Sequence, residues 1–218
     1  GKLRHILGQL TPGLVFASGP AFAKAITAVV PADTPVVLTE GAIEGRATLS
    51  FADLLKTAAT PAVDAAHEKV GPDTIAKFLF TSGSTKLPKG VINTQRMLCA
   101  NQQMILQCFP ALGQEPPVLV HWLPWNHTFG GNHNVGMTIY NGGTLYIDDG
   151  KPTPALMGET LRNLRDIAPT VYFNVPTGFE SIANAMTTDD QFRKNLLSRA
   201  QMFFPADAAR ATPVWVIL

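Results

Sequence analysis

The amino-acid sequence predicts an α/β fold in which a largely parallel sheet is flanked by helices. Short apolar runs rich in Val, Ile and Phe alternate along the chain with longer segments whose apolar residues recur at helical spacing. This alternation is typical of parallel strands joined by crossover helices. The chain has 218 residues, 46% of them hydrophobic, which is enough for one sizeable core or two smaller lobes.

The expected elements follow from these two patterns in chain order. Strands are predicted at 14–17, 36–39, 75–81, 118–123, 144–147, 171–174 and 201–204. Helices are predicted at 21–30, 51–58, 95–109, 131–140, 154–167, 176–186 and 191–198. The segments 40–50 and 148–152 are rich in Gly, Asp and Glu, and we expect surface connections there.

Several boundaries have a local chemical reason. Asn93 or Thr94 can cap the helix that follows. The Gly142-Gly143 pair can end a helix before the strand at 144–147. Thr153, followed by Pro154 at a first helical position, predicts a helix start at that point.

Composition excludes several classes of function. Charged residues make up 15% of the chain and the formal net charge is +1, so we expect neither nucleic-acid binding nor a charged tail. The longest apolar runs, 21–31 and 75–80, are too short to cross a membrane, so no membrane partner is expected.

The two cysteines and the N-terminal residues bear on the compartment. Cys99 and Cys108 lie nine residues apart in a helical pattern, which is too far for a disulfide within one helix. We expect two buried or half-buried free thiols. Residues 1–5 are not followed by a signal-peptide apolar core, and a reducing cytoplasmic location is predicted.

Residues 81–90 resemble a phosphate-binding loop. They read Thr-Ser-Gly-Ser-Thr-Lys-Leu-Pro-Lys-Gly and directly follow an apolar run. Small hydroxylated residues and glycine let backbone N–H groups and hydroxyls converge on anionic oxygens, and Lys89 adds a positive charge. The loop is not a Walker A motif, because no hydroxyl residue follows the Lys89-Gly90 pair.

A second informative stretch runs from His121 to Gly131. It leaves an apolar strand at Pro124 and places aromatic residues and a histidine before a Gly-Gly pair. His121, His127 and His133 recur every six residues, which raises the alternative of a zinc site. Six is neither a helical nor a strand ligand spacing, and no cysteine or carboxylate lies within the stretch, so no metal site is predicted.

The loop at 81–90 resembles the signature of the acyl-adenylate-forming superfamily, which includes acyl-CoA synthetases and peptide-synthetase adenylation domains. That signature is Thr-Ser-Gly-Ser/Thr-Thr-Gly-x-Pro-Lys-Gly, and the chain differs from it at Lys86, where the family usually has glycine. The resemblance implies that the loop binds the phosphates of ATP. The residues implied are Thr81, Ser82, Gly83, Ser84, Thr85, Lys89 and Gly90.

The same resemblance assigns roles in the second stretch. The family's Leu-Pro-x-x-His segment lines the acyl pocket, and here its histidine is His127. His127 is therefore implied as the catalytic residue that orients the substrate carboxylate. Trp125, Phe129 and Gly130 are implied to line the acyl pocket. A donor beside the carboxylate makes physical sense because the carboxylate and the ATP phosphates repel each other.

Within the superfamily, the chain looks similar to feruloyl-CoA synthases, which activate hydroxycinnamic acids. The similarity lies in 83–97, 121–131, 141–152 and 172–176. It is weaker near the end, where Asp207 stands at a position at which the family has glycine.

The resemblance implies an ATP-dependent acyl-CoA synthetase that uses ATP, Mg2+ and CoA and a small carboxylic acid such as ferulate. The acid is first adenylated and then transferred to CoA. Residues 1–218 would form part of the family's N-terminal, AMP-binding domain without the small C-terminal domain, so the isolated chain is expected to be inactive.

Two alternatives stay open. One is an adenylation module that passes its acyl group to a carrier protein. The other is a non-catalytic α/β binding domain in which Lys86 and Asp207 mark the loss of nucleotide binding. The sequence does not determine the oligomeric state.

Overall fold

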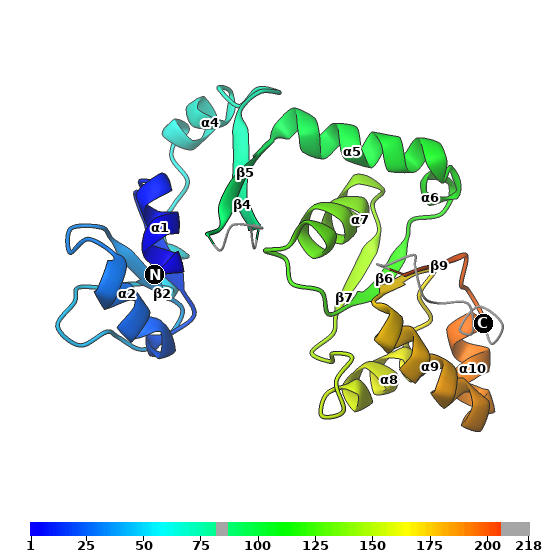
Figure 1. Ribbon diagram of the computed structural model, residues 1–218. Coiled ribbons are helices and arrows are strands. Elements are labelled where there is room, and N and C mark those ends of the chain that lie inside the picture. Colours follow the sequence, from blue (N-terminus) through cyan, green and yellow to red (C-terminus); the bar gives the residue numbers. More distant parts are fainter. Residues whose placement is uncertain (82–86, 206–218) are drawn as a thin grey trace. The chain divides into compact units, whose positions relative to one another are not determined.

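The structure is a computed structural model that describes residues 1–81 and 87–205 (Figure 1). The chain divides into two compact units, Gly1–Gln95 and Arg96–Leu218. Both combine helices with short strands, which confirms the predicted α/β class. Ser82, Gly83, Ser84, Thr85, Lys86 and Asp207 lie outside the described residues, so what the sequence predicts for them stays a prediction.

The first unit is built around three short parallel strands. Its elements are α1 (Lys2–Gln9), β1 (Val15–Ala17), η1 (Pro20–Phe22), α2 (Ala23–Val29), β2 (Val36–Leu38), β3 (Leu49–Ser50), α3 (Phe51–Leu54), α4 (Pro61–His67), β4 (Ile75–Thr81) and β5 (Lys89–Thr94). The strand order is β1-β2-β3, with all pairs parallel. The core of this sheet is formed by Ile26, Val30, Val36, Leu38 and Ile43.

Strands β4 and β5 form an antiparallel ribbon of their own, which departs from the expectation of parallel pairing. Thr81 faces Lys89 and Phe80 faces Gly90 across the ribbon. The apolar pattern predicts β4 but no strand at β5. Its Lys, Gly and Asn residues weaken the apolar signal, and pairing with β4 is what holds these residues extended.

The second unit contains two parallel strand pairs and most of the long helices. Its elements are α5 (Gln95–Cys108), α6 (Ala111–Gln114), β6 (Val118–His121), η2 (Thr128–Val135), α7 (Gly136–Tyr140), β7 (Thr144–Ile147), α8 (Met157–Asp166), β8 (Val171–Asn174), α9 (Pro176–Thr188), α10 (Asp190–Leu197) and β9 (Met202–Pro205). β6 pairs with β7 and β8 pairs with β9.

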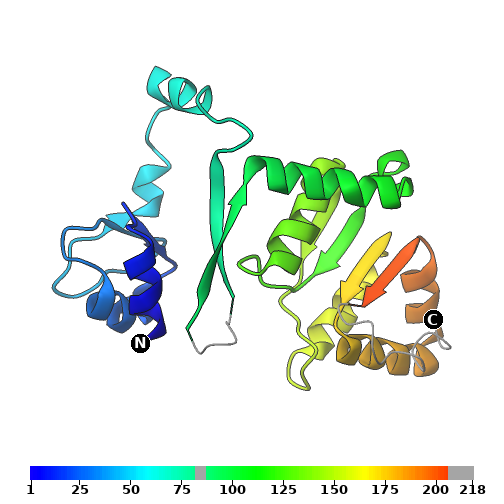
Figure 2. The same cartoon turned by 45° about the horizontal axis from the view of Figure 1, so that its top comes forward.

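Hydrogen bonds between Val118 and Thr170 join these two strand pairs. The backbone N–H of Val118 donates to the Thr170 hydroxyl (2.8 Å), and the Thr170 N–H donates to the Val118 carbonyl (3.0 Å). β6 and β8 therefore lie side by side at the centre of the unit (Figure 2).

Helices cover both faces of these central strands. Val120 and Tyr172 point into a core shared with α8, α9 and α10. Leu119 and Phe173, their neighbours in sequence, point into the opposite core. This alternation is the period-two pattern of strands buried on both faces.

Several expectations about boundaries and burial need correction. The helix predicted from 154 begins at Met157, because the turn before it closes from the Leu156 and Met157 N–H groups onto the Thr153 carbonyl. A π-helix, η2, replaces the first part of the α-helix predicted at 131–140. Cys99 and Cys108 are free, as expected, but exposed instead of buried.

Three helices, α1, α4 and α6, were not predicted from the sequence. α1 is only eight residues long and has no side-chain cap, so its signals are weak. Gly142 confirms its predicted role, because its φ of 63° lies in the left-handed region directly after α7.

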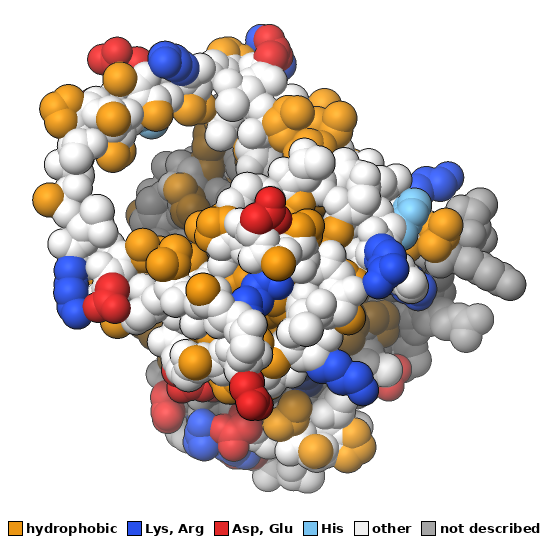
Figure 3. Space-filling model, turned by 90° about the vertical axis from the view of Figure 1, so that its left-hand side faces the viewer, with side chains coloured by type: hydrophobic (Ala, Val, Ile, Leu, Met, Phe, Trp, Pro, Cys, Tyr) orange, Lys and Arg blue, Asp and Glu red, His pale blue; other side chains and the backbone are white. Residues whose placement is uncertain are grey.

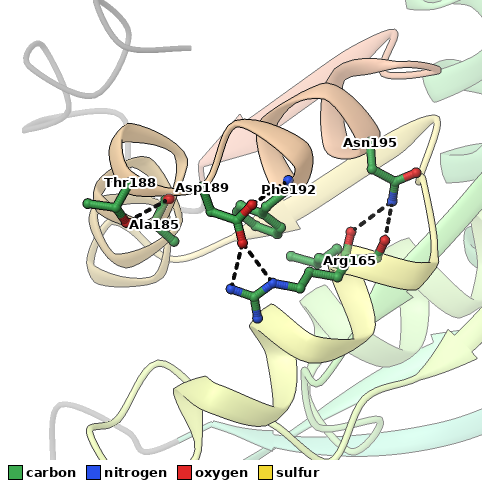
Figure 4. A network of polar contacts seen from close by, with 7 residues as sticks. Arg165, Ala185, Thr188, Asp189, Phe192 and Asn195 are labelled. Carbon is green, nitrogen blue, oxygen red and sulfur yellow. Dashed lines mark hydrogen bonds and ion pairs between the residues drawn. The ribbon is translucent and has the colours of Figure 1, made fainter.

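The corner between α8 and α10 is fixed by polar contacts (Figure 4). Asp189 caps α10 by accepting a hydrogen bond from the Phe192 N–H (2.9 Å), and it pairs with Arg165. These two interactions, the backbone hydrogen bond first, hold the pKa of Asp189 below its usual value. Asn195 donates to the carbonyls of Leu164 (3.1 Å) and Arg165 (2.7 Å), which satisfies the end of α8.

The helices and the surface charges relate to the predictions made from composition about membranes and nucleic acids. No helix in the described ranges is long and apolar enough to cross a membrane. On the face drawn in Figure 3, acidic and basic side chains lie near one another in several places. Hydrophobic side chains lie between them on that face.

We predict that Asn195→Asp destabilises the second unit by about 1–3 kcal/mol. The substitution keeps the shape but replaces a donor with a carboxylate oxygen that faces two carbonyls. Urea unfolding followed by tryptophan fluorescence checks this, because all three tryptophans lie within 96–218.

The matched control is Asn184→Asp, which adds the same charge at an exposed position on α9. It should change the free energy of unfolding by less than about 0.5 kcal/mol. Equal effects of the two substitutions would show that charge, not the lost donor, is responsible.

Candidate functional site

In the first unit, the ends of the proposed phosphate loop are held by the β4–β5 ribbon. Thr81 and Lys89 are directly opposite each other, so their side chains extend from the same face of the ribbon. Both are exposed. A hydroxyl and an ammonium group side by side are two donors suited to phosphate oxygens.

The base of this loop is also anchored to α1. The carbonyl of Pro88, a buried residue, accepts a hydrogen bond from His5 Nε2 at 3.0 Å. Gly90 lies against the Phe80 ring, and a Cβ at this position would approach that ring to 3.4 Å. Thr81, Lys89 and Gly90, the described residues of the loop, thus lie at an end of the ribbon that is held by contacts with His5 and Phe80.

In the second unit, the polar residues gather where parallel strands end. His121 ends β6, Asp148 follows β7 and Asn174 ends β8. All three are buried, and the Asp148 N–H donates to the His121 carbonyl (3.1 Å). The carboxyl edge of a parallel sheet is the usual position of a ligand site in α/β proteins.

His127 lies exposed in the segment that connects β6 to η2. It is the N-cap of η2, and its Nδ1 accepts a hydrogen bond from the Phe129 N–H at 3.2 Å. Because Nδ1 is an acceptor, the neutral ring carries its hydrogen on Nε2. The cap therefore leaves Nε2–H as a donor available to a ligand.

Trp125 is half exposed, with 51% of its surface accessible, and its polar atom is engaged. The indole Nε1–H donates to His121 Nε2 at 3.1 Å. About half of this large aromatic side chain is thus accessible while its N–H edge is held by a buried group.

The Gly130-Gly131 pair allows close backbone packing under this segment. A Cβ on Gly130 would lie 2.3 Å from the Pro124 carbonyl oxygen, and one on Gly131 would lie 2.0 Å from that of Trp125. No side chain fits at either position. The glycines therefore let η2 pack directly against the turn that carries Trp125 and His127.

Phe129 is half-buried and faces an aromatic cluster. Its ring centroid lies 5.9 Å from that of Phe173 and 5.6 Å from that of His133. His133 in turn lies edge-on to Phe173 at 4.8 Å. Burial lowers the pKa of His133, with a smaller opposing effect from Asn134.

His121 is a site residue that the sequence analysis did not select. Its side chain is 2% exposed, and burial lowers its pKa to about 4, against a smaller opposing effect of Asp148. The Asn134 amide lies 3.3 Å from His121 Nδ1 and 2.8 Å from His133 Nδ1. The available signal was a histidine inside an otherwise apolar strand.

Asp148 and Tyr172 complete the buried polar edge. Asp148 accepts hydrogen bonds from Gly150 N–H (2.8 Å), the Thr160 hydroxyl (2.6 Å) and the Asn163 amide (2.9 Å). Burial raises the pKa of Tyr172, and the Asp148 charge acts in the same direction. Tyr172 is therefore a neutral phenol at physiological pH.

No metal centre is found in the part of the chain that the structure describes. Within 1–81 and 87–205, no three His, Cys, Asp or Glu side chains are grouped so that they could hold a metal ion. His121 and His133 are both engaged by Asn134.

The fold is similar to that of known protein structures. One solved structure, an anthranilate CoA ligase AuaEII in complex with anthranoyl-AMP, superimposes with a TM-score of 0.71 over 99% of this chain and 40% of that chain, at 19% identity. At such low identity, the similarity establishes the fold alone.

Several curated proteins are similar in sequence, and two of them illustrate the range. Medium-chain-fatty-acid–[acyl-carrier-protein] ligase TtuA of Teredinibacter turnerae is 40% identical over 75 residues, which are 34% of this chain and 11% of that protein. Long chain acyl-CoA synthetase 6, peroxisomal, of Arabidopsis thaliana is 27% identical over 154 residues, 66% of this chain and 20% of that protein. The chain thus spans a fifth or less of these relatives.

The AMP-binding enzyme family matches residues 1–215, nearly the whole chain. The chain therefore belongs to the AMP-binding enzyme family.

Proposed function

We propose that the protein is an ATP-dependent, AMP-forming acyl-CoA synthetase of the cytoplasm, and that residues 1–218 form part of its N-terminal AMP-binding domain. The observation that carries the proposal is the Thr-Ser-Gly-Ser-Thr signature between β4 and β5, with Lys89 at its base, in a chain of the AMP-binding family. The names of the relatives, two of them ligases and one a synthetase of acyl groups, support the same chemistry.

The first step is adenylation of a carboxylic acid. A carboxylate oxygen attacks the α-phosphorus of ATP, the bond to the β-phosphate oxygen breaks, and pyrophosphate leaves as acyl-AMP forms. Thr81, Lys89 and the loop between them would bind the departing phosphates and stabilise their growing charge. ATP enters such reactions with Mg2+, which shields the phosphates.

His127 would act on the acid. Its Nε2–H is directed away from the capping bond and can donate to a carboxylate oxygen. A single hydrogen bond of this kind fixes the attacking oxygen and offsets its repulsion by the phosphates. Trp125, Phe129 and Gly130 would line the space for the acyl group.

In the second step, the CoA thiolate sulfur attacks the acyl carbonyl carbon and AMP leaves with the electron pair of the broken C–O bond. For the acid we propose a hydroxycinnamate such as ferulate. The half-exposed Trp125 ring supports a planar aromatic substrate.

Transfer to a carrier protein instead of CoA is a second candidate. It is favoured by the 40% identity to a protein whose name specifies an acyl-carrier-protein ligase. Transfer of a labelled acyl group to free CoA or to a phosphopantetheinyl carrier protein separates the two.

Carboxylate-dependent exchange of labelled pyrophosphate into ATP tests the adenylation step. The protein in its full encoded length should catalyse exchange with ferulate and more slowly with octanoate. Exchange with octanoate alone would retain the chemistry and discard the aromatic substrate. No exchange with a broad panel of acids would favour a non-catalytic domain.

Replacement of Lys89 by Ala should slow pyrophosphate exchange by about tenfold or more, because a charged contact to the phosphates is lost. Lys69→Ala, at another exposed lysine of the same unit, is the control and should leave the rate unchanged. An unaltered rate in the Lys89 variant would remove this residue from the mechanism.

His127→Asn separates the two functions of this histidine. The Asn oxygen can still cap η2, so stability should be preserved, while the Nε2–H donor is lost. We expect a fall in the exchange rate of about tenfold or more with little change in melting temperature. His67→Asn, at an exposed histidine of α4, should affect neither quantity.

A further inference from the structure

We propose that His121 is a positioning residue that fixes the indole of Trp125, and that this fixed ring makes the site select planar aromatic acids over flexible alkyl acids. The selectivity rests on the proposed function, whereas the positioning stands on the contacts alone. His121 itself is buried at the N–H edge of the indole and is not expected to touch the acid.

The turn that carries Trp125 is held through its backbone. The His127 N–H donates to the Pro124 carbonyl (3.1 Å), which closes the turn around Trp125. Gly131 packs so closely against the Trp125 carbonyl oxygen that a Cβ there would lie at 2.0 Å. Movement of the main chain at Trp125 would therefore require movement of η2.

η2 is itself braced from α5. Gln102, a buried residue, donates from Nε2 to the Asn132 carbonyl at 2.7 Å. A Cβ on Gly136, just after η2, would lie 2.6 Å from the same Gln102 nitrogen. The backbone of η2, against which the Trp125 turn packs, is thus itself closely packed.

The side chain of Trp125 still has two rotatable bonds, and the hydrogen bond to His121 restricts them. An indole N–H can only donate, so the partner nitrogen must be an unprotonated acceptor. His121 meets this condition, because burial keeps its ring neutral near pH 7. A lysine, an arginine or a protonated histidine at position 121 could not accept this hydrogen bond, because it would place a second N–H donor against the indole N–H.

Burial keeps the His121 ring neutral although the nearby Asp148 charge favours protonation. Because Nε2 accepts from the indole, the neutral ring carries its hydrogen on Nδ1, which lies 3.3 Å from the Asn134 side-chain amide of η2. Asp148, after β7, is the carboxylate that acts on the ring through its charge, while its own oxygens accept three hydrogen bonds. His133 lies on the far side of Asn134, and Tyr172 on β8 is a neutral phenol.

A fixed aromatic wall should discriminate between acids. A planar ring stacks on a rigid indole face without further ordering of the protein, so little entropy is lost on binding. An alkyl chain gains less from a flat, immobile surface. If the indole could rotate, the wall would adapt to either acid and selectivity would fall.

The first measurement is the indole N–H signal of Trp125 in protein labelled with 15N-tryptophan, assigned by its loss in Trp125→Phe. His121→Leu should shift this signal upfield and accelerate its exchange with solvent. His121→Gln, whose amide oxygen can still accept, should restore most of the protection. His67→Leu, at an exposed position of α4, should change nothing.

The second measurement is the ratio of kcat/KM for ferulate and octanoate in pyrophosphate exchange. His121→Leu should lower this ratio by about fivefold to tenfold, the size expected for one lost positioning bond, mainly through a higher KM for ferulate. His121→Gln should retain a ratio close to that of the unaltered protein.

The outcomes are separable. An unchanged indole signal in His121→Leu overturns the positioning role, whatever the activity. A changed signal with an unchanged selectivity ratio overturns the specificity role. Absence of exchange with any acid in the unaltered protein rejects the proposed function and the selectivity with it, and the indole signal still decides the positioning.

Discussion

The hydrogen bonds between Val118 and Thr170 are the constraint on which the second unit depends. They place β6 beside β8, so that Val120 and Tyr172 face one core while Leu119 and Phe173 face the other. They also place the carboxyl ends of both strands at one edge of the sheet. The position of the proposed acyl site depends on that alignment, because the turn with Trp125 and His127 follows β6 at this edge.

Two histidines at this edge differ in burial and in their hydrogen bonds. His121 is 2% exposed and is kept neutral, so it can only serve other side chains. His127 is exposed and uses one nitrogen as a cap, which leaves the other free for a ligand. The sequence shows two histidines six residues apart and gives no measure of this difference.

The parts of the fold that could be predicted are those with a strong local signal. Strands such as 144–147 and 171–174 were predicted with the observed bounds because apolar, β-branched or aromatic residues fill them. β5 was not predicted, because pairing with β4 and not its own sequence holds it extended. His127 and Trp125 could be selected from a family motif. His121 could not, since its role depends on a hydrogen bond between residues of a strand and a turn.

The buried polar edge also explains why the proposed aromatic wall, the Trp125 indole, would be rigid. Asp148, Asn174 and His121 would each be costly to bury alone, and each is hydrogen-bonded to residues distant in sequence or in another segment. Such a network tolerates little displacement, because moving one member leaves another buried polar group without its partner. A side chain attached to this network inherits its rigidity. Trp125 is linked to this network by one hydrogen bond, to His121, and the exposed part of its ring is therefore held in one orientation.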